Sequence, residues 1–269
     1  MSLNPLTVDM PAHLNGRGPA AAPPSPAVLV EGVSQVFERG SAPVLEGVNL
    51  TVAPGEFVCL VGASGCGKST LLNLIAGLTE PTTGRIEVGS ERPALMFQEP
   101  ALLPWLTASG NVELALRARG VGRAERRSEA QRLLRVVNLA GHAGKRVHEL
   151  SGGMRQRVAL ARALAQDSSV LLMDEPFAAL DAITRDVLHQ ELARVWSEQG
   201  LSIVFVTHNV REAARLGQRV VLMGSRPGRV VREWQVDLPQ PRTIESPGVS
   251  SLAAEITREL HQEISRHAQ

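Results

Sequence analysis

Aromatic side chains and net charge are both scarce in this sequence. The 269-residue chain contains no tyrosine, and aromatic residues make up only 3% of it. Proteins that bind single-stranded nucleic acid stack bases on such side chains, so this composition disfavours that function. The 28 Lys and Arg residues nearly balance the 27 Asp and Glu residues, which leaves a net charge of +1. We therefore expect no nucleic acid partner and no general attraction to an anionic membrane.

Cysteines and long apolar runs are also few. The two cysteines, Cys59 and Cys66, cannot form a disulfide framework, and they are typical of a reducing, cytosolic compartment. No run of 18 apolar residues occurs, so we expect no membrane span. The N-terminus lacks the basic, apolar and small-residue zones of a secretory signal. A chain of this length suits one large domain or two small ones.

Glycines, by contrast, are concentrated in one informative place. The segment GASGCGKST fits the pattern G-x-x-x-x-G-K-[ST], between an apolar run at 57–61 that predicts a buried strand and a run at 71–77 that predicts a helix. Glycines let backbone N–H groups converge on a phosphate, and the N-terminus of the helix adds positive potential. We predict that Lys68 reaches the β- and γ-phosphates and that the Ser69 hydroxyl binds Mg²⁺. The predicted phosphate cradle consists of Gly62, Ala63, Ser64, Gly65, Cys66, Gly67, Lys68, Ser69 and Thr70.

A second pattern places two acidic residues at the end of an expected strand. In VLLMDEP, from Val170 to Pro176, four apolar residues precede Asp174 and Glu175. Polar residues at the carboxyl ends of strands face the ligand crevice in open α/β sheets. We assign Asp174 to Mg²⁺ and Glu175 to the water that attacks the γ-phosphate. Alone, the pattern would indicate a solvated acidic turn; beside the glycine loop it favours an ATP-hydrolysing site.

The third pattern is LSGGMRQR, from Leu150 to Arg157. Ser151 is placed to cap a helix, and Gly152 and Gly153 leave the N–H groups of its first turn accessible. One interpretation is a second phosphate-binding end, which would serve the nucleotide of another chain. The alternative is an ordinary capped helix.

Strand and helix patterns alternate along the chain, which predicts an α/β fold with a mainly parallel sheet. On the helix at 184–199 we expect one apolar face, formed by Val187, Leu188, Leu192, Val195 and Trp196. Strands are expected at 28–37, 48–52, 57–61, 85–88, 93–97, 170–176, 201–208 and 219–223 and up to about 236, and further helices at 71–77, 211–217 and 252–264.

Composition divides the chain into parts. Residues 1–27 are rich in Pro and Ala and predict a flexible tail, whereas 28–236 form the expected ATPase domain and 237–269 a C-terminal extension. A helical block at about 98–162 looks inserted. Its stretch 119–135 carries six Arg against two Glu, and we interpret it as a solvated helix face in preference to a face near lipid headgroups.

The order of these motifs resembles the nucleotide-binding subunit of ABC transporters over about residues 28–235. Met154 stands where that family more often has Gln. The segments ALLPWLT at 101–107, DEPFAALDAITR at 174–185 and SRPGRV at 225–230 are similar to the ATPases of nitrate, sulfonate and taurine importers. The resemblance implies a P-loop NTPase (RecA-like) core, an antiparallel β subdomain and an inserted α-helical subdomain, with ATP and Mg²⁺ bound.

The resemblance also implies partners. Two ATPase subunits, identical in the simplest case, would close head to tail over two ATP molecules, each held between the glycine loop of one chain and Ser151–Gly153 of the other. They would act with transmembrane permease subunits at the cytoplasmic face of the inner membrane, and indirectly with a periplasmic or extracellular solute-binding protein. A split exporter ATPase is the alternative, followed by a soluble ABC ATPase, against which the single cassette and the lack of heptads argue.

Further roles follow from the resemblance residue by residue. Gln98 is similar to the residue that senses Mg²⁺ and the attacking water, and His208 to the histidine that contacts the γ-phosphate. Glu175 corresponds to the catalytic base and Asp174 to the Mg²⁺ carboxylate. Asp181 is similar to the residue that crosses the dimer interface, although Ala178 stands where Ser or Gly is usual.

Four more residues each allow two interpretations. Phe37 either stacks on adenine, as implied by the resemblance, or belongs to the core. Cys66 lies beside Lys68 at a helix N-terminus, which should lower its pKa, yet we read it as a spacer in preference to a redox switch. Leu103 and Trp105, which follow Gln98, either form a site for the permease or fill the core between subdomains.

Overall fold

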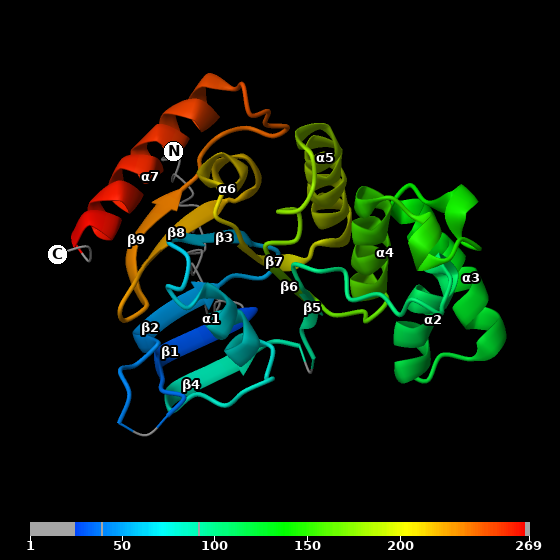
Figure 1. The fold of residues 1–269 in the computed structure, drawn as a ribbon, viewed down its shortest axis with the longest axis horizontal. Helices are drawn as coiled ribbons and strands as arrows, with labels where there is room; N and C mark the ends of the chain where they lie inside the picture. Colours follow the sequence, from blue (N-terminus) through cyan, green and yellow to red (C-terminus); the bar gives the residue numbers. More distant parts are fainter. Residues whose placement is uncertain (1–24, 39, 91, 267–269) are drawn as a thin grey trace, which may run out of the picture.

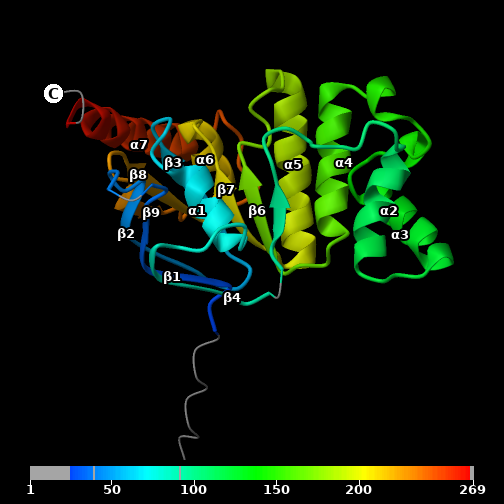
Figure 2. The same cartoon turned by 60° about the horizontal axis from the view of Figure 1, so that its bottom comes forward.

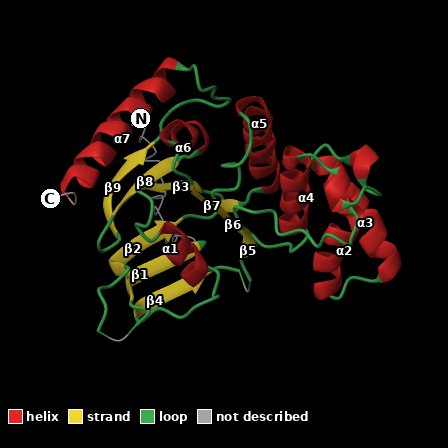
Figure 3. Cartoon of the chain, in the orientation of Figure 1, coloured by secondary structure: helices red, strands yellow, loops and turns green. Residues whose placement is uncertain are grey.

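The computed structural model describes residues 25–38, 40–90 and 92–266, so the predicted N-terminal tail lies outside the described residues as far as residue 24. Two sheets form the body of the molecule (Figures 1 and 3). The antiparallel sheet has the order β2-β1-β4, with β1 (Val28–Gln35), β2 (Leu45–Val52) and β4 (Thr83–Val88). The larger sheet has the order β5-β6-β7-β3-β8-β9, with β3 (Phe57–Gly62), β5 (Ala94–Met96), β6 (Val170–Asp174), β7 (Ser202–Val206), β8 (Arg219–Gly224) and β9 (Arg229–Gln235).

The larger sheet is parallel except for β9, which pairs antiparallel with β8. The α-helices in the described residues are α1 (Lys68–Ile75), α2 (Ala108–Ala118), α3 (Arg123–Val136), α4 (Gly152–Leu164), α5 (Ala182–Gln199), α6 (Val210–Leu216) and α7 (Pro247–Arg266). Short 3₁₀ turns lie at Ala140–His142 and Val147–Glu149. The expected α/β class, with a mainly parallel sheet and a separate antiparallel one, is confirmed.

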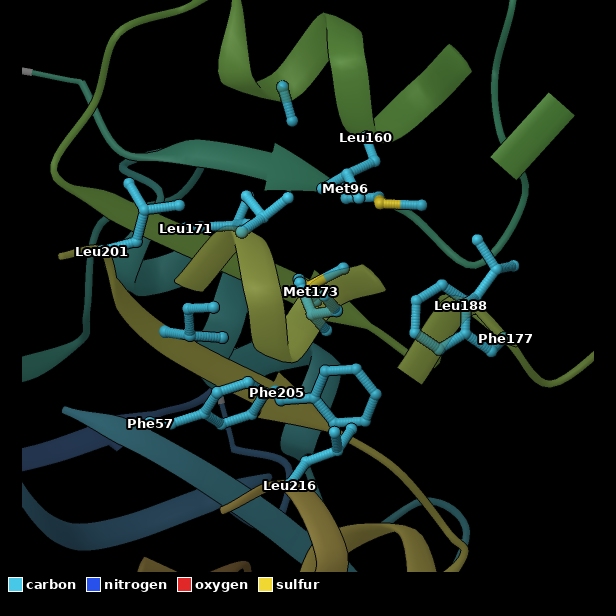
Figure 4. Packing of buried hydrophobic residues seen from close by; sticks show 14 of the residues in the cluster. Phe57, Met96, Leu160, Leu171, Met173, Phe177, Leu188, Leu201, Phe205 and Leu216 are labelled. Carbon is cyan, nitrogen blue, oxygen red and sulfur yellow. The ribbon is translucent and has the colours of Figure 1, made fainter. Parts of the chain in front are cut away.

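Both faces of the larger sheet are buried, as its continuous apolar strands predict. In β3, Phe57 and Cys59 join the core beneath α5 and α6, whereas Val58 and Leu60 join the second core, which contains α1 and the antiparallel sheet. The period of two follows from the alternation of side chains along a strand. Figure 4 shows the first core, where the Phe57 and Phe205 rings lie 5.9 Å apart.

Helices α2, α3 and α4 pack together beyond β5 and α5, on the side away from α1 (Figures 1 and 2). Arg119 to Arg135 is largely exposed here, with Leu133, Leu134 and Ala130 as the buried contacts of α3. This agrees with the solvated-face interpretation. None of the helices in the described part of the chain is long and apolar enough to cross a lipid bilayer.

The structure corrects the expected elements in detail. Strand β1 ends at Gln35, two residues before Phe37, and α1 begins at Lys68 rather than at Leu71. On α5 the expected apolar face is wrong at Val187, which is 41% exposed. Leu188, Leu192 and Val195 already complete the buried stripe at i, i+4 and i+7, and Val187 lies about 100° around the helix from Leu188.

Candidate functional site

The glycine loop joins β3 to α1 and is shaped by close packing. A Cβ at Gly62 would lie 2.6 Å from the Met223 carbonyl oxygen, and one at Gly67 would lie 2.5 Å from Cδ2 of Leu45. Gly67, which caps α1, also has a φ of +94°, a conformation that favours glycine. The backbone therefore curls tightly because these two positions carry no side chain.

Lys68 lies under this loop and is only 6% exposed. Its Nζ donates to the carbonyl oxygens of Gly62, at 2.9 Å, and of Ala63, at 3.0 Å. A buried ammonium held at the mouth of a backbone cradle fits a phosphate, whose oxygens are stronger acceptors than carbonyls. Ser69, in the first turn of α1, is exposed and next to the lysine.

The register of three parallel strands determines where the other site residues lie. Asp174 of β6 pairs with Val206 of β7, and Val206 pairs with Leu60 of β3. Beyond these pairs, the backbone N–H of Glu175 donates to Val206 O at 3.0 Å, and that of Thr207 donates to Leu60 O at 3.1 Å. The ends of β6 and β7 are thereby fixed beside the strand that leads into the glycine loop.

Glu175 and His208 meet at this edge. Nδ1 of His208 lies 3.0 Å from Oε2 of Glu175. Glu175 has a φ of +43°, which is uncommon for a residue with a side chain and costs on the order of 1–3 kcal/mol. The sequence indicated both residues, but it indicated neither their contact nor the strained backbone at Glu175.

Asp174 lies in the same corner. Burial raises the pKa of its carboxyl; a hydrogen bond from the Ser69 side chain opposes this shift, the nearby Glu175 adds to it, and the Lys68 charge opposes it. A hydroxyl oxygen and a carboxylate oxygen side by side are ligands of the type that binds Mg²⁺, together with phosphate oxygens. The predicted Mg²⁺ pair, Ser69 and Asp174, therefore fits the ion.

The expectation for the Cys66 thiol is wrong. Cys66 is fully buried, and burial raises the pKa of its thiol despite the opposing charge of Lys68, whose Nζ lies 3.7 Å from Sγ. The helix N-terminus and the lysine were visible in the sequence, but the desolvation that outweighs them was not. The spacer interpretation agrees with a buried thiol.

Met96, the last residue of β5, pairs with Met173 of β6. Gln98 lies two residues after Met96, and Glu175 lies two residues after Met173. Gln98 therefore lies at the same sheet edge, with an exposed side chain. Within the described residues, no hydrogen bond joins that side chain to either acidic residue. Its carbonyl oxygen instead accepts from Nε2 of Gln156 in α4, at 2.9 Å.

The segment after Gln98 is held by side chains that sequence reasoning missed. Arg162 of α4 donates to Pro100 O at 2.8 Å and to Ala101 O at 2.7 Å. Asn111 of α2, which is fully buried, accepts from the Leu103 N–H at 2.8 Å and donates back to the Leu103 carbonyl. The sequence signal that could have identified Arg162 and Asn111 is a polar residue on the side of a predicted helix that faces the interior.

Ser151 caps α4, as predicted: its hydroxyl accepts from the Met154 N–H at 3.3 Å. Gly153 is required by packing, because a Cβ there would collide with Cγ2 of Thr184 on α5. Asp181 caps α5 by accepting from the Thr184 N–H at 2.9 Å, and this bond lowers the pKa of its carboxyl. The two helix N-termini therefore lie against each other.

These capped ends do not complete the phosphate cradle of their own chain. Among the described residues, no hydrogen bond connects 151–153 with 62–70, and α4 and α1 lie on opposite sides of β6 in both views (Figures 1 and 2). Among the remaining open residues Leu103 is half-buried, whereas Phe37 is 62% exposed and Trp105 is 66% exposed. The alternative that Phe37 or Trp105 fills a core is therefore wrong.

Comparisons with known proteins agree with this geometry. The family model described as "ABC transporter" matches residues 45–178. A taurine import ATP-binding protein, TauB, of Burkholderia pseudomallei (strain 1710b) is 48% identical over 220 residues, which cover 78% of this chain and 84% of that protein. A nitrate import ATP-binding protein, NrtD, of Synechocystis sp. is 46% identical over 219 residues, covering 78% and 82%.

Solved structures show the same fold. A dimeric bacterial ABC transporter cassette has a TM-score of 0.70 at 34% sequence identity, and it covers 79% of this chain and 100% of that chain. A dimeric ATP-binding cassette in a post-hydrolysis state bound to ADP and Pi gives 0.69 at the same identity and coverage.

Proposed function

The chain belongs to the ABC transporter family, as an ATP-hydrolysing subunit of an importer, and from this premise we propose that it drives the uptake of a small anionic solute of the nitrate, sulfonate or taurine type. The observation that supports the site is the meeting of Lys68, Asp174, Glu175 and His208 at the carboxyl edge of one parallel sheet. The solute class rests on the relatives named for taurine and nitrate import.

In the proposed mechanism the glycine loop and Lys68 hold the β- and γ-phosphates of ATP. Ser69 and Asp174 hold Mg²⁺, which supplies charge neutralisation during phosphoryl transfer. Glu175 accepts a proton from the attacking water. His208 steadies the Glu175 carboxylate through its Nδ1, 3.0 Å away, and faces the γ-phosphate. Gln98 senses both the metal ion and the water.

The second half of the site comes from a second subunit. Ser151, Gly152 and Gly153 present the N-terminus of α4 to the nucleotide of the partner in a head-to-tail homodimer, and Asp181 crosses the same interface. Phe37 stacks on adenine. The permease docks at the exposed Trp105 and the half-buried Leu103, and the assembly lies at the cytoplasmic face of the membrane, served by an external solute-binding protein.

Replacing Glu175 with Gln tests this proposal. The amide keeps the shape of the side chain and loses its basicity, so the ATPase rate should fall by about 100-fold or more, while ATP binding persists and the ATP-closed dimer accumulates. ATPase assays and sedimentation with ATP-Mg²⁺ measure both effects. Glu129→Gln, on the outer surface of α3, is the matched control. Near-normal turnover in Glu175→Gln would remove Glu175 from the catalytic role.

A further inference from the structure

A hollow of about 610 Å³ lies between α5, α6 and residues 240–243. Much of its wall is apolar and comes from Ala193, Trp196, Leu216 and Pro241. Nothing in the mechanism of ATP hydrolysis uses this hollow. Its size is in the range of small-molecule sites, which are mostly apolar with a few placed polar groups.

The polar part of the wall is cationic. Three arginines line the hollow, and none of its described lining residues is acidic. Arg215 is paired with Asp186, and Arg194 is paired with Glu198 and also donates to the carbonyl oxygen of Val136 in α3; none of these partners belongs to the lining. Arg242 is different: within the part of the chain that the structure describes, its guanidinium donates only to backbone carbonyls, such as Gly217 O at 2.6 Å and Val236 O at 3.0 Å. One buried positive charge therefore stands beside the hollow without a carboxylate partner.

We propose that this hollow is an effector site for a small organic anion, a carboxylate or sulfonate on a short apolar chain. The apolar wall accommodates the chain, and the arginines provide the favourable field for the anionic group. A carboxylate or sulfonate is the form of charge that guanidinium groups recognise best.

The site is connected to the catalytic edge through buried polar groups. Nη1 of Arg215 lies 3.4 Å from Nδ1 of His189. The other ring nitrogen of His189 shares a hydrogen bond with Glu212, which also accepts from the Thr207 hydroxyl. Thr207 directly precedes His208. All four linking residues, Arg215, His189, Glu212 and Thr207, are at most 5% exposed.

A ligand that draws Arg215 toward the hollow therefore acts on the hydrogen bonds that hold the backbone before His208. Such buried networks have few alternative arrangements, so a shift at one end is passed on. The link predicts that the anion changes the ATPase rate. This regulatory part rests on the proposed role of His208, whereas binding at the hollow does not.

Binding is tested first, by calorimetry on the full chain with 1-pentanesulfonate, without nucleotide. We expect saturable binding, at least 10-fold weaker in Arg194→Gln and absent in Ala193→Phe, whose ring would fill the hollow. Arg132→Gln is the matched control, because Arg132 also pairs with a glutamate of its own helix; it should bind like the unchanged chain. Absence of saturable binding, equal binding of 1-pentanol or sulfate, or binding that survives Ala193→Phe would overturn the site.

The link is tested by the ATPase rate with and without 1-pentanesulfonate. The anion should change the rate at least twofold in the unchanged chain and in Arg132→Gln, and not in Arg194→Gln at the same concentration. In Glu212→Gln the anion should still bind but should no longer change the rate. Binding with no effect on an active enzyme would overturn the link. A chain that binds the anion but hydrolyses no ATP would instead count against the proposed function.

Discussion

Trp105→Ala separates a surface for a partner from a structural role, and the exposure of the side chain sets the expected magnitude. A fully buried Trp removes up to about 250 Å² from water. Trp105 is 66% exposed, so about a third of that area, roughly 80 Å², is in contact with the chain. At about 25 cal/mol per Å², the change should lower the free energy of unfolding by no more than about 2 kcal/mol.

Chemical denaturation measures this loss against a core reference. Phe57 is fully buried between the rings of Trp196 and Phe205, and Phe57→Ala should cost about 3–5 kcal/mol. ATP affinity should be unchanged in Trp105→Ala, while co-purification with the permease and solute-stimulated ATPase activity are lost. Leu78→Ala, a change at another exposed apolar residue (61%), should affect neither.

The reasoning would be refuted if Trp105→Ala destabilised the chain as much as Phe57→Ala while the permease still bound. Trp105 would then be part of the packed core despite its 66% exposure, and the permease would have to dock elsewhere.

Three further changes test the nucleotide site. Lys68→Ala should weaken ATP binding at least 10-fold in a fluorescent-nucleotide titration, because it removes the ammonium charge that attracts the phosphates. An unchanged dissociation constant would contradict the cradle assignment. Ser151→Arg should leave ATP binding by the monomer intact and prevent closure of the dimer, so cooperative ATPase activity in this variant would argue against the two-chain site. Asp174→Asn should raise the melting temperature of the nucleotide-free chain at pH 7. The pKa of Asp174 is raised in the folded state, so its charged form opposes folding and stability falls as pH rises through that pKa; the difference between variant and unchanged chain should vanish in acid, and a gain that persists there would rule out this cause.

The sequence was sufficient for the parts of the fold that depend on local pattern. Apolar strands, helix periods and the capping serine at 151 predicted the element order and the carboxyl-edge placement of Asp174 and Glu175. The boundaries at Gln35 and Lys68 differ from the predicted ones, because strand ends and first helical turns depend on pairing partners. Val187 shows the limit for helices: on a helix with apolar residues at neighbouring angles, only the packed sheet decides which ones are buried.

The site details that escaped prediction depend on how separate segments pack against one another or on local backbone conformation. The pKa of Cys66 follows from what covers the thiol, and the contact between His208 and Glu175 follows from strand register and from a left-handed backbone at Glu175. The roles of Gln156 and Asn111 arise from a loop that ends up beside their helices. Sequence spacing carries no information on such encounters.

The fastening of the segment at 98–105 has a mechanical consequence. Its carbonyl groups are held by side chains of α2 and α4 and by Arg146, which donates to Trp105 O at 3.1 Å. A load applied at Trp105 is thus carried into the helical block rather than into the sheet. Helix α4 would then behave as a lever, with the load entering along its side and Ser151 at its moving tip.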